Sequence, residues 1–396
     1  MKSRISAGLC LASFLFLAGC KGFWDLPPST TTNPTTPTTL SSGVFYVLDQ
    51  TTKEVVGYAI TSGTLGAISG GTQTLSAAPF SIAVAPNGDF LYVGTVNGIY
   101  LYTIGSGGAL SIANGGDAIS GDIPSAMVIS GSWLLDAFTN ANGTVQMNAI
   151  AIDSSNGTYT GTSGTPPGQT FTVANAVVKQ MVLSPDSANF FLALGAGGTI
   201  VVPFASGNAN PLGATATTIP VANSGGSALS VAVDPSATPR LFYIGETLAV
   251  GASGGLRAFN YSSLGSNPLT QATGSPIASG GLAPNAILPL ANGDYIYVAN
   301  GQGTTSAGNV AWFPITASGT TYTVAAGKTV TTGIQPSGLA EDSTSNFVLA
   351  VSTGGTTNSG DPDLEAYTMS SGALTAALTG ATGTDPTGAL AIAALP

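Results

Sequence analysis

Short runs of apolar residues alternate with turn residues along most of this chain, and residues 79–113 show the pattern most clearly. In that stretch the runs SIAVA, FLYVGT and IYLYTI are rich in β-branched and aromatic residues. Asn-Gly and Gly-Gly pairs bound them, and a fourth run begins at Ala109. Runs of this kind between Gly- and Asn-rich turns are typical of β-strands joined by hairpins. The stretch therefore predicts a unit of four antiparallel strands.

The same unit recurs along the chain about every 50 residues, which is typical of propellers and solenoids. Runs that match its second strand lie at 44–49, 90–95, 133–139, 190–195, 241–246, 295–300 and 347–352. Runs that match its third strand lie at 55–60, 99–104, 147–152, 199–204, 256–261, 310–315 and 364–369. The repeats predict seven units, and no segment of 43–396 has the periodicity of an amphipathic helix.

The two ends of this array are complementary. The array begins with a second strand at Val44, and it ends with a first strand within 385–395. Pairing of these two fragments would complete the seventh unit and close the array into a ring without open ends. An open β-solenoid or two β-sandwiches would not explain such ends. We therefore predict an all-β fold, a single seven-bladed β-propeller over 43–396 in which the C-terminal strand pairs with the N-terminal blade.

The N-terminus has the pattern of an export signal. Lys2 and Arg4 precede an uncharged apolar run from Ile5 to Phe16, which is too short to span a bilayer. The tetrapeptide Leu-Ala-Gly-Cys that ends at Cys20 resembles the lipobox of bacterial lipoproteins. This resemblance implies cleavage before Cys20 and lipidation of its thiol.

We therefore predict a signal peptide over 1–19, a lipidated Thr- and Pro-rich tether over 20–42, and attachment to the cell envelope through the lipid on Cys20. Lys21 stands where an Asp would resemble an inner-membrane retention signal, so the outer membrane is favoured, facing the periplasm or the cell surface. Cys10 is the only other cysteine and lies in the signal, so no thiol remains for disulfides, metals or redox chemistry.

The composition excludes some functions. Charged residues make up 7% of the chain, against about a quarter in a typical soluble domain. Without Lys2 and Arg4, 6 basic side chains face 18 acidic ones, a net charge of −12. Nucleic-acid binding needs a dense basic surface, so it is excluded, and anionic substrates such as phosphosugars are disfavoured. The exposed surface must consist mainly of Thr, Ser, Asn and Gly.

Several repeats resemble those of the lactonase-type seven-bladed propellers. The residues that carry the resemblance are PFSIAVAPNGDFLYV at 79–93, the tetrapeptide Tyr-Val-Ala-Asn at 297–300 and the turn SSGALT at 370–375. This group includes 6-phosphogluconolactonase-like proteins and surface proteins with Tyr-Val-Thr-Asn repeats. The resemblance covers nearly all of 43–396 and implies the fold. It also implies, as an alternative function, a lactonase-like hydrolase or cyclase outside the cytoplasm.

Few residues are candidates for chemistry, because the chain has no histidine and so no Ser–His–Asp triad. Glu246 ends a second strand and Arg257 lies near the start of the next third strand, where a cross-strand ion pair is favoured over ligand binding. Asp361, Asp363 and Glu365 alternate along one extended segment, where a solvated acidic loop is favoured over a calcium site. No metal or cofactor is predicted.

Two classes of function remain open. We favour a non-catalytic binding or scaffold module, a monomeric propeller whose protein, glycan or small-molecule ligand the sequence does not reveal. The alternative is the lactonase-like enzyme. Arg, Asp or Glu around the central channel would indicate the enzyme, whereas Thr, Ser and Ala would indicate binding. The connections 247–255, 301–309 and 353–363 are longer than the earlier ones, so we expect a ligand site on the face where they emerge.

Overall fold

The computed structural model describes residues 42–61, 63–161, 166–266, 268–318, 321–354, 362–377, 386 and 388–396. The predicted signal peptide, Cys20, most of the tether and Asp361 lie outside these residues. The described chain is built almost wholly of strands and contains no α-helix. Its short 3-10 turns are η1 (Ser106–Gly108), η2 (Asn114–Gly116) and η3 (Tyr261–Ser263). No helix in this part of the chain is long and apolar enough to cross a membrane.

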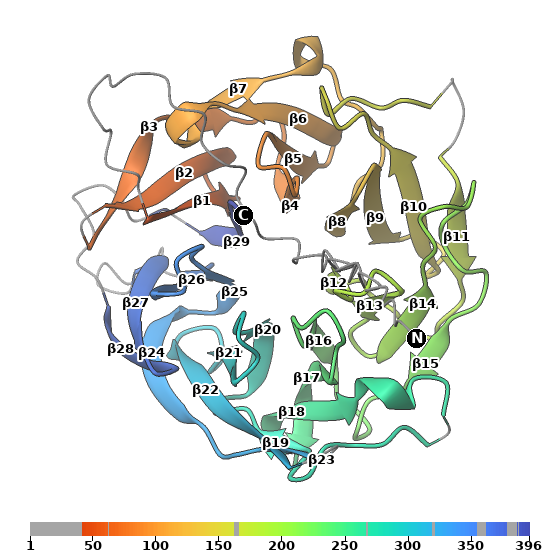
Figure 1. The fold of residues 1–396 in the computed structure, drawn as a ribbon, viewed down its shortest axis with the longest axis vertical. Coiled ribbons are helices and arrows are strands. Elements are labelled where there is room, and N and C mark those ends of the chain that lie inside the picture. The colour runs from red at the N-terminus through yellow and green to blue at the C-terminus, as the bar shows by residue number, and fades with distance from the viewer. Residues whose placement is uncertain are drawn as a thin grey trace, which may run out of the picture. The chain divides into compact units, whose positions relative to one another are not determined.

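The strands form seven antiparallel sheets that surround a common centre as the blades of a propeller (Figure 1). Blade 1 contains, from the centre outward, β29 (Ala389–Ala394), β1 (Ser42–Asp49), β2 (Glu54–Thr61) and β3 (Thr64–Thr74). Blade 2 contains β4 (Pro79–Val84), β5 (Phe90–Thr95), β6 (Gly98–Ile104) and β7 (Leu110–Ile112). Blade 3 contains β8 (Ala126–Ser130), β9 (Trp133–Thr139), β10 (Val145–Ala151) and β11 (Gly168–Phe171).

The remaining four blades follow the same plan. Blade 4 contains β12 (Gln180–Leu183), β13 (Asn189–Ala193), β14 (Thr199–Pro203) and β15 (Thr217–Ile219). Blade 5 contains β16 (Ala228–Val233), β17 (Leu241–Val250), β18 (Ser253–Asn260) and β19 (Ile277–Ala278). Blade 6 contains β20 (Ala283–Pro289), β21 (Tyr295–Gly301), β22 (Ala307–Ser318), β23 (Thr321–Val324) and β24 (Lys328–Ile334). Blade 7 contains β25 (Pro336–Glu341), β26 (Phe347–Ser352), β27 (Leu364–Ser370) and β28 (Ala373–Ala377).

Blade 1 joins the two ends of the propeller, as the sequence predicts. β29 pairs antiparallel with β1, with Ala394 opposite Phe45 and Ala389 opposite Asp49. The pairing continues past the strand, because the Leu395 N–H donates to the Val44 carbonyl at 2.8 Å. The C-terminal segment is thus the innermost strand of the blade that begins the domain, and this closes the ring.

The second strands carry the apolar core. Every residue of β5 is buried, because successive side chains point to opposite faces of a blade and both faces pack against neighbours. In blade 3, for example, Leu134 packs toward blade 2 and Leu135 toward blade 4. Between blades 4 and 5, the rings of Phe191 and Phe242 lie 5.0 Å apart. The core therefore consists of the interfaces between blades.

A tyrosine in the second strand ties several blades to the next one. In each case the hydroxyl group donates to a glycine carbonyl in a tight turn of the following blade, where the glycine has a positive φ. The pairs are Tyr46 with Gly108 at 2.9 Å, Tyr92 with Gly157 at 2.8 Å, and Tyr297 with Gly372 at 2.8 Å. The recurring tyrosine of these repeats is therefore explained by blade-to-blade packing.

The structure departs from the sequence prediction in one connection and in the number of strands in one blade. Residues 247–255 are not a long loop, because β17 continues to Val250 and pairs it with Ser253 of β18. Blade 6 has a fifth strand, because the 12 residues of β22 pair with β24 at one end and with β23 at the other. Of the expected loop 353–363, residues 355–361 lie outside the described residues.

Candidate functional site

The seven innermost strands enclose a central channel with a cavity of about 620 Å³ (Figure 1). A volume of this size is typical of sites for small ligands. All seven blades contribute to the lining. The channel is therefore the one place in the described fold where every repeat presents side chains to a shared space.

A β-bulge near the start of the innermost strand in blades 1, 2, 5, 6 and 7 determines which side chain faces the rim of this channel. In blade 2, Pro79 and Ser81 pair with the adjacent residues Thr95 and Gly94 of β5, so Phe80 is the extra residue. Such a bulge re-aims the extra side chain. Equivalent residues of all seven blades line the cavity, and we call them the bulge ring: Phe80, Ser125, Lys179, Leu229, Asn285, Ser337 and Leu390.

A second set of lining residues lies two positions further along the same strands, about 6–7 Å deeper in the channel. These side chains are all apolar, and we call them the apolar ring: Ile82, Met127, Met181, Ile287, Leu339 and Ile392. The methionines add adaptable surface, because their unbranched side chains fit differently shaped ligands. The channel thus combines a mixed polar rim with an apolar interior.

Lys179 is the only charged residue in the lining of the cavity. It is exposed, and no ion pair to it is found within the described part of the chain. A Cβ added to Gly195, in the turn after β13, would lie 3.7 Å from the Lys179 Cε. The side chain therefore extends past that turn, and its ammonium group is available to a ligand at the rim.

Connections from blades 6 and 7 complete the mouth of the channel. Gly303 and Thr304 follow β21, Thr353 follows β26, and all three line the cavity. Gln335 also lines it and has a left-handed backbone with a φ of 53°. Its carbonyl accepts a hydrogen bond from the Thr353 N–H at 3.2 Å. Strained backbone of this kind clusters at functional sites, so it supports the mouth as the place where a ligand enters.

Exposed apolar side chains lie at or just before the starts of four innermost strands. Ile123, Val177 and Leu282 each lie one to three residues before an innermost strand, and Phe80 belongs to the bulge ring. Exposed apolar residues that gather around a concave site are typical of ligand-binding surfaces. We call these four residues the apolar collar.

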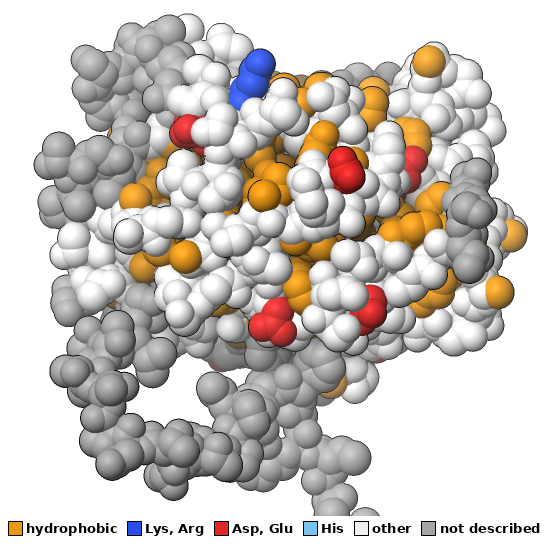
Figure 2. Space-filling view, turned by 90° about the horizontal axis from the view of Figure 1, so that it is seen from above, with side chains coloured by type: hydrophobic (Ala, Val, Ile, Leu, Met, Phe, Trp, Pro, Cys, Tyr) orange, Lys and Arg blue, Asp and Glu red, His pale blue; other side chains and the backbone are white. Residues whose placement is uncertain are grey.

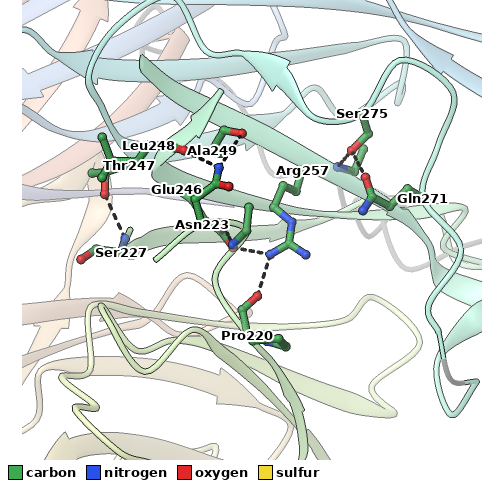
Figure 3. A network of polar contacts seen from close by, with 12 residues as sticks. Pro220, Asn223, Ser227, Glu246, Thr247, Leu248, Ala249, Arg257, Gln271 and Ser275 are labelled. Carbon is green, nitrogen blue, oxygen red and sulfur yellow. Dashed lines mark hydrogen bonds and ion pairs between the residues drawn. The ribbon is translucent and has the colours of Figure 1, made fainter. Parts of the chain in front are cut away.

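Glu246 and Arg257 form the ion pair that the sequence predicts (Figure 3). They lie diagonally across the β17–β18 hairpin, because Glu246 pairs with Gly255 and Arg257 pairs with Ile244. The Arg257 Nη1 donates to the Glu246 Oε1 at 2.6 Å. Glu246 is fully buried and Arg257 is 8% exposed, so the pair is largely removed from solvent.

The remaining contacts of this pair are structural. Arg257 also donates to the Pro220 carbonyl at 2.8 Å (Figure 3). The Glu246 Oε2 accepts from the Ala222 N–H at 2.8 Å. The guanidinium group lies over the ring of Phe259 at 4.9 Å. The pair thus holds the connection between β15 and β16 against blade 5, and neither residue lines the channel.

The three acidic residues that precede and begin β27, Asp361, Asp363 and Glu365, do not form one cluster among the described residues. Asp363 is buried, and its Oδ2 accepts from the Gly388 N–H at 2.6 Å, next to the ring closure. Glu365 accepts from the Tyr367 hydroxyl group at 2.6 Å. Asp361 lies outside the described residues. Among those that the structure describes, no group of three His, Cys, Asp or Glu side chains is placed to hold a metal ion.

Blade 3 contains a buried carboxyl group that the sequence analysis did not select. Asp136 of β9 is fully buried, and its Oδ1 accepts from the Asn148 Nδ2 at 3.3 Å. Burial and then the neighbouring Asp122 raise the pKa of Asp136 well above its usual value. The Oδ2 atom of Asp136 has no hydrogen-bond partner among the described residues. Asp136 does not line the cavity.

Two features of the sequence could have indicated Asp136 and part of the bulge ring. Asp136 is the charged residue inside the apolar run 133–139, and Pro79, Pro124, Pro284 and Pro336 each precede the bulge-ring residue by one position. A proline that recurs at the start of four first strands marks the bulge. Lys179 has no such proline before it, so its place in the ring follows only from the pairing of β12 with β13.

These features define a class of fold, the closed seven-bladed β-propeller. Among solved structures, the chain superposes on the "putative 6-phosphogluconolactonase" of Bacteroides fragilis with a TM-score of 0.66, at 15% identity, over 92% of this chain and 100% of that one. The corresponding protein of Bacteroides uniformis gives a TM-score of 0.65 at 17% identity, over 89% of this chain and 99% of that one. The Pseudomonas aeruginosa periplasmic gluconolactonase gives 0.63 at 17% identity, over 89% and 99%.

These likenesses establish the fold of the chain, and at such identities they establish the fold alone. No family model and no curated protein sequence matches the chain. Its function must therefore be argued from its own channel.

Proposed function

We propose that this protein is an exported, lipid-anchored binding module whose propeller takes a small ligand in the central channel. The observation that carries the proposal is the lining of the cavity, where the bulge ring and the apolar ring offer polar contacts, apolar surface and a single cation, Lys179. A few polar groups around a mostly apolar concave surface are typical of small-molecule sites.

The lining also favours binding over hydrolysis. None of its residues is an aspartate, a glutamate or an arginine. General base catalysis needs a group that accepts a proton within hydrogen-bond reach of the reacting atom. Glu246 is buried and already holds Arg257 and the Ala222 N–H, and Asp136 lies one strand further from the channel axis than the lining residue Met127. Neither is available to a ligand in the cavity.

The surface fits a protein that avoids polyanionic partners. The face in Figure 2 is mostly uncharged, with acidic groups scattered singly and no broad basic patch among its described atoms. Both arginines that the structure describes, Arg240 and Arg257, form ion pairs, with Asp234 and Glu246 respectively. A neutral surface of this kind suits an exported domain whose specificity resides in one channel rather than in its outer faces.

A lactonase-like hydrolase outside the cytoplasm is the second candidate. The fold neighbours favour it, since one of them is a periplasmic gluconolactonase. Such an enzyme here would have to work on a neutral lactone with Lys179 as its only charged lining group. Hydrolysis of a neutral sugar lactone that disappears in a Lys179→Gln variant would favour this candidate over the binding module.

Blocking the channel should abolish ligand binding without unfolding the protein. Ser125 belongs to the bulge ring, is exposed and makes no side-chain hydrogen bond within the described residues, so Ser125→Trp places an indole ring in the cavity. We expect this variant to bind the neutral apolar probe N-phenyl-1-naphthylamine at least about tenfold more weakly, measured by fluorescence titration. Ser111→Trp, on the outer strand of blade 2, is the control and should bind normally. Equal binding by all three proteins would place the site outside the channel.

The anchor is tested at Cys20. Lipidation by more than one acyl chain gives membrane attachment far stronger than that of a single chain. We expect Cys20→Ser to abolish incorporation of labelled palmitate and to release the protein from the membrane fraction, whereas Cys10→Ser should change neither. A Cys20→Ser protein that is still processed before position 20 and stays with the membrane would contradict the anchor.

A further inference from the structure

We infer that the channel takes an amphipathic monoanion, such as an acyl or aromatic carboxylate, with its charged group at Lys179 and its apolar part against the apolar ring. This inference rests on the proposed binding function and specifies the class of ligand.

The position of Lys179, the only cation in the lining of the cavity, indicates that the ligand is an anion. Lys179 lies in the bulge ring, and no carboxylate of the described chain pairs with it. None of the other lining residues is charged, so the ammonium group sets the sign of the potential at the rim. Asn285 also lies in the bulge ring, where its Nδ2 donates one N–H to the Pro336 carbonyl at 2.8 Å and keeps a second N–H. Gln335 lies at the mouth and carries an amide group that can donate to a carboxylate.

One cation limits the charge of the ligand. A phosphorylated sugar carries about two negative charges at neutral pH, and recognition of such groups usually needs several donors or an arginine. The two arginines of the propeller are used in ion pairs away from the lining. A single carboxylate is therefore the better match for Lys179.

The residues deeper in the channel than Lys179 are apolar, which indicates that the ligand is amphipathic. Two residues along β12 from Lys179 is Met181, and the equivalent lining residues of other inner strands include Met127 of β8 and Ile287 of β20. A fully polar ligand would leave this surface unused, and burying each methylene group against it is worth about 0.8 kcal/mol. The exposed Val177, two residues before Lys179, lies beside the Gly195 turn that Lys179 also contacts.

Octanoate and octanol provide a matched pair of probes, because they share an alkyl chain and differ in charge. We expect the full-length protein to bind octanoate more tightly than octanol by competition with N-phenyl-1-naphthylamine. Lys179→Gln should weaken octanoate binding about two- to fivefold, the upper range of an exposed ion pair, and leave octanol unchanged. Lys179→Arg should retain octanoate binding, and Lys328→Gln, an exposed lysine of β24 that does not line the cavity, should behave as the native protein.

The outcomes separate this inference from the function on which it rests. Equal affinity for octanoate and octanol, or an unchanged octanoate affinity in Lys179→Gln, would overturn the anion selectivity while channel binding stands. Failure of both probes to displace N-phenyl-1-naphthylamine from the native protein would also overturn it. Octanoate binding that weakens with added salt in the native protein but not in Lys179→Gln would support it, because partly exposed charge pairs are screened.

Discussion

Deleting residues 385–396 should leave a protein that does not form the closed ring. The deletion removes β29, so β1 loses its inner partner and presents an unpaired edge. Leu390 and Ile392 are partly buried against blade 1 and its neighbours, so their removal costs a part of the about 1.5–3 kcal/mol that full burial of such a side chain is worth. Two ties to blade 7 also disappear, from the Ser337 Oγ to the Ala389 carbonyl and from the Gly388 N–H to Asp363. Since domains are stable by only about 5–15 kcal/mol, we expect most of the stability to be lost.

Calorimetry and analytical ultracentrifugation measure this effect. The truncated protein should melt at a much lower temperature or aggregate through the exposed strand edge, whereas deletion of Pro396 alone should change little, since it follows β29. Adding a synthetic peptide of residues 385–396 should restore part of the stability by strand addition. A truncated protein that melts like the full chain would show that the ring does not need its C-terminal strand.

Replacing Arg257 by methionine should destabilise the protein by about 3–5 kcal/mol, because the fully buried Glu246 keeps its charge and loses its partner. The Ala222 N–H would remain the only donor to that carboxylate that we identify. Glu246→Gln combined with Arg257→Met removes both charges and should recover at least about half of the loss. Urea unfolding of the two single variants and the double variant gives the coupling energy. Lys53→Met, at an exposed lysine, should stay within about 0.5 kcal/mol of the native protein.

The same variants separate a structural from a functional role for the ion pair. If the pair only holds the connection between β15 and β16, each variant that still folds binds N-phenyl-1-naphthylamine as the native protein does. An Arg257→Met protein with native stability but no probe binding would contradict the structural role. It would make Glu246 and Arg257 part of the site.

The sequence predicts the architecture well because the propeller repeats a local signal. Each second strand is a run of buried β-branched and aromatic residues, so the count of seven could be read without knowing any contact. The closure was predictable because Val44 starts without an inner strand and 385–395 ends without an outer one. The fifth strand of blade 6 was not predictable, because the pairing of β22 with β23 depends on how far β22 extends beyond β21.

The candidate site was harder to predict because it depends on register. The place of Lys179 in the bulge ring depends on how the start of β12 pairs with β13, where the Lys179 N–H donates to the Ala193 carbonyl at 2.9 Å. The ion pair of Glu246 and Arg257 could be predicted because it lies within one hairpin. Convergence of residues from seven blades on one cavity is a property of the closed ring, which no local pattern reports.

The central claim, that the channel is the binding site, is tested most directly by a crystal structure of the protein with N-phenyl-1-naphthylamine. We predict that the probe lies between the bulge ring and the apolar ring, in contact with Met127 and Met181. A structure in which the cavity holds only water while the probe lies between two blades or on the outer surface would contradict the claim.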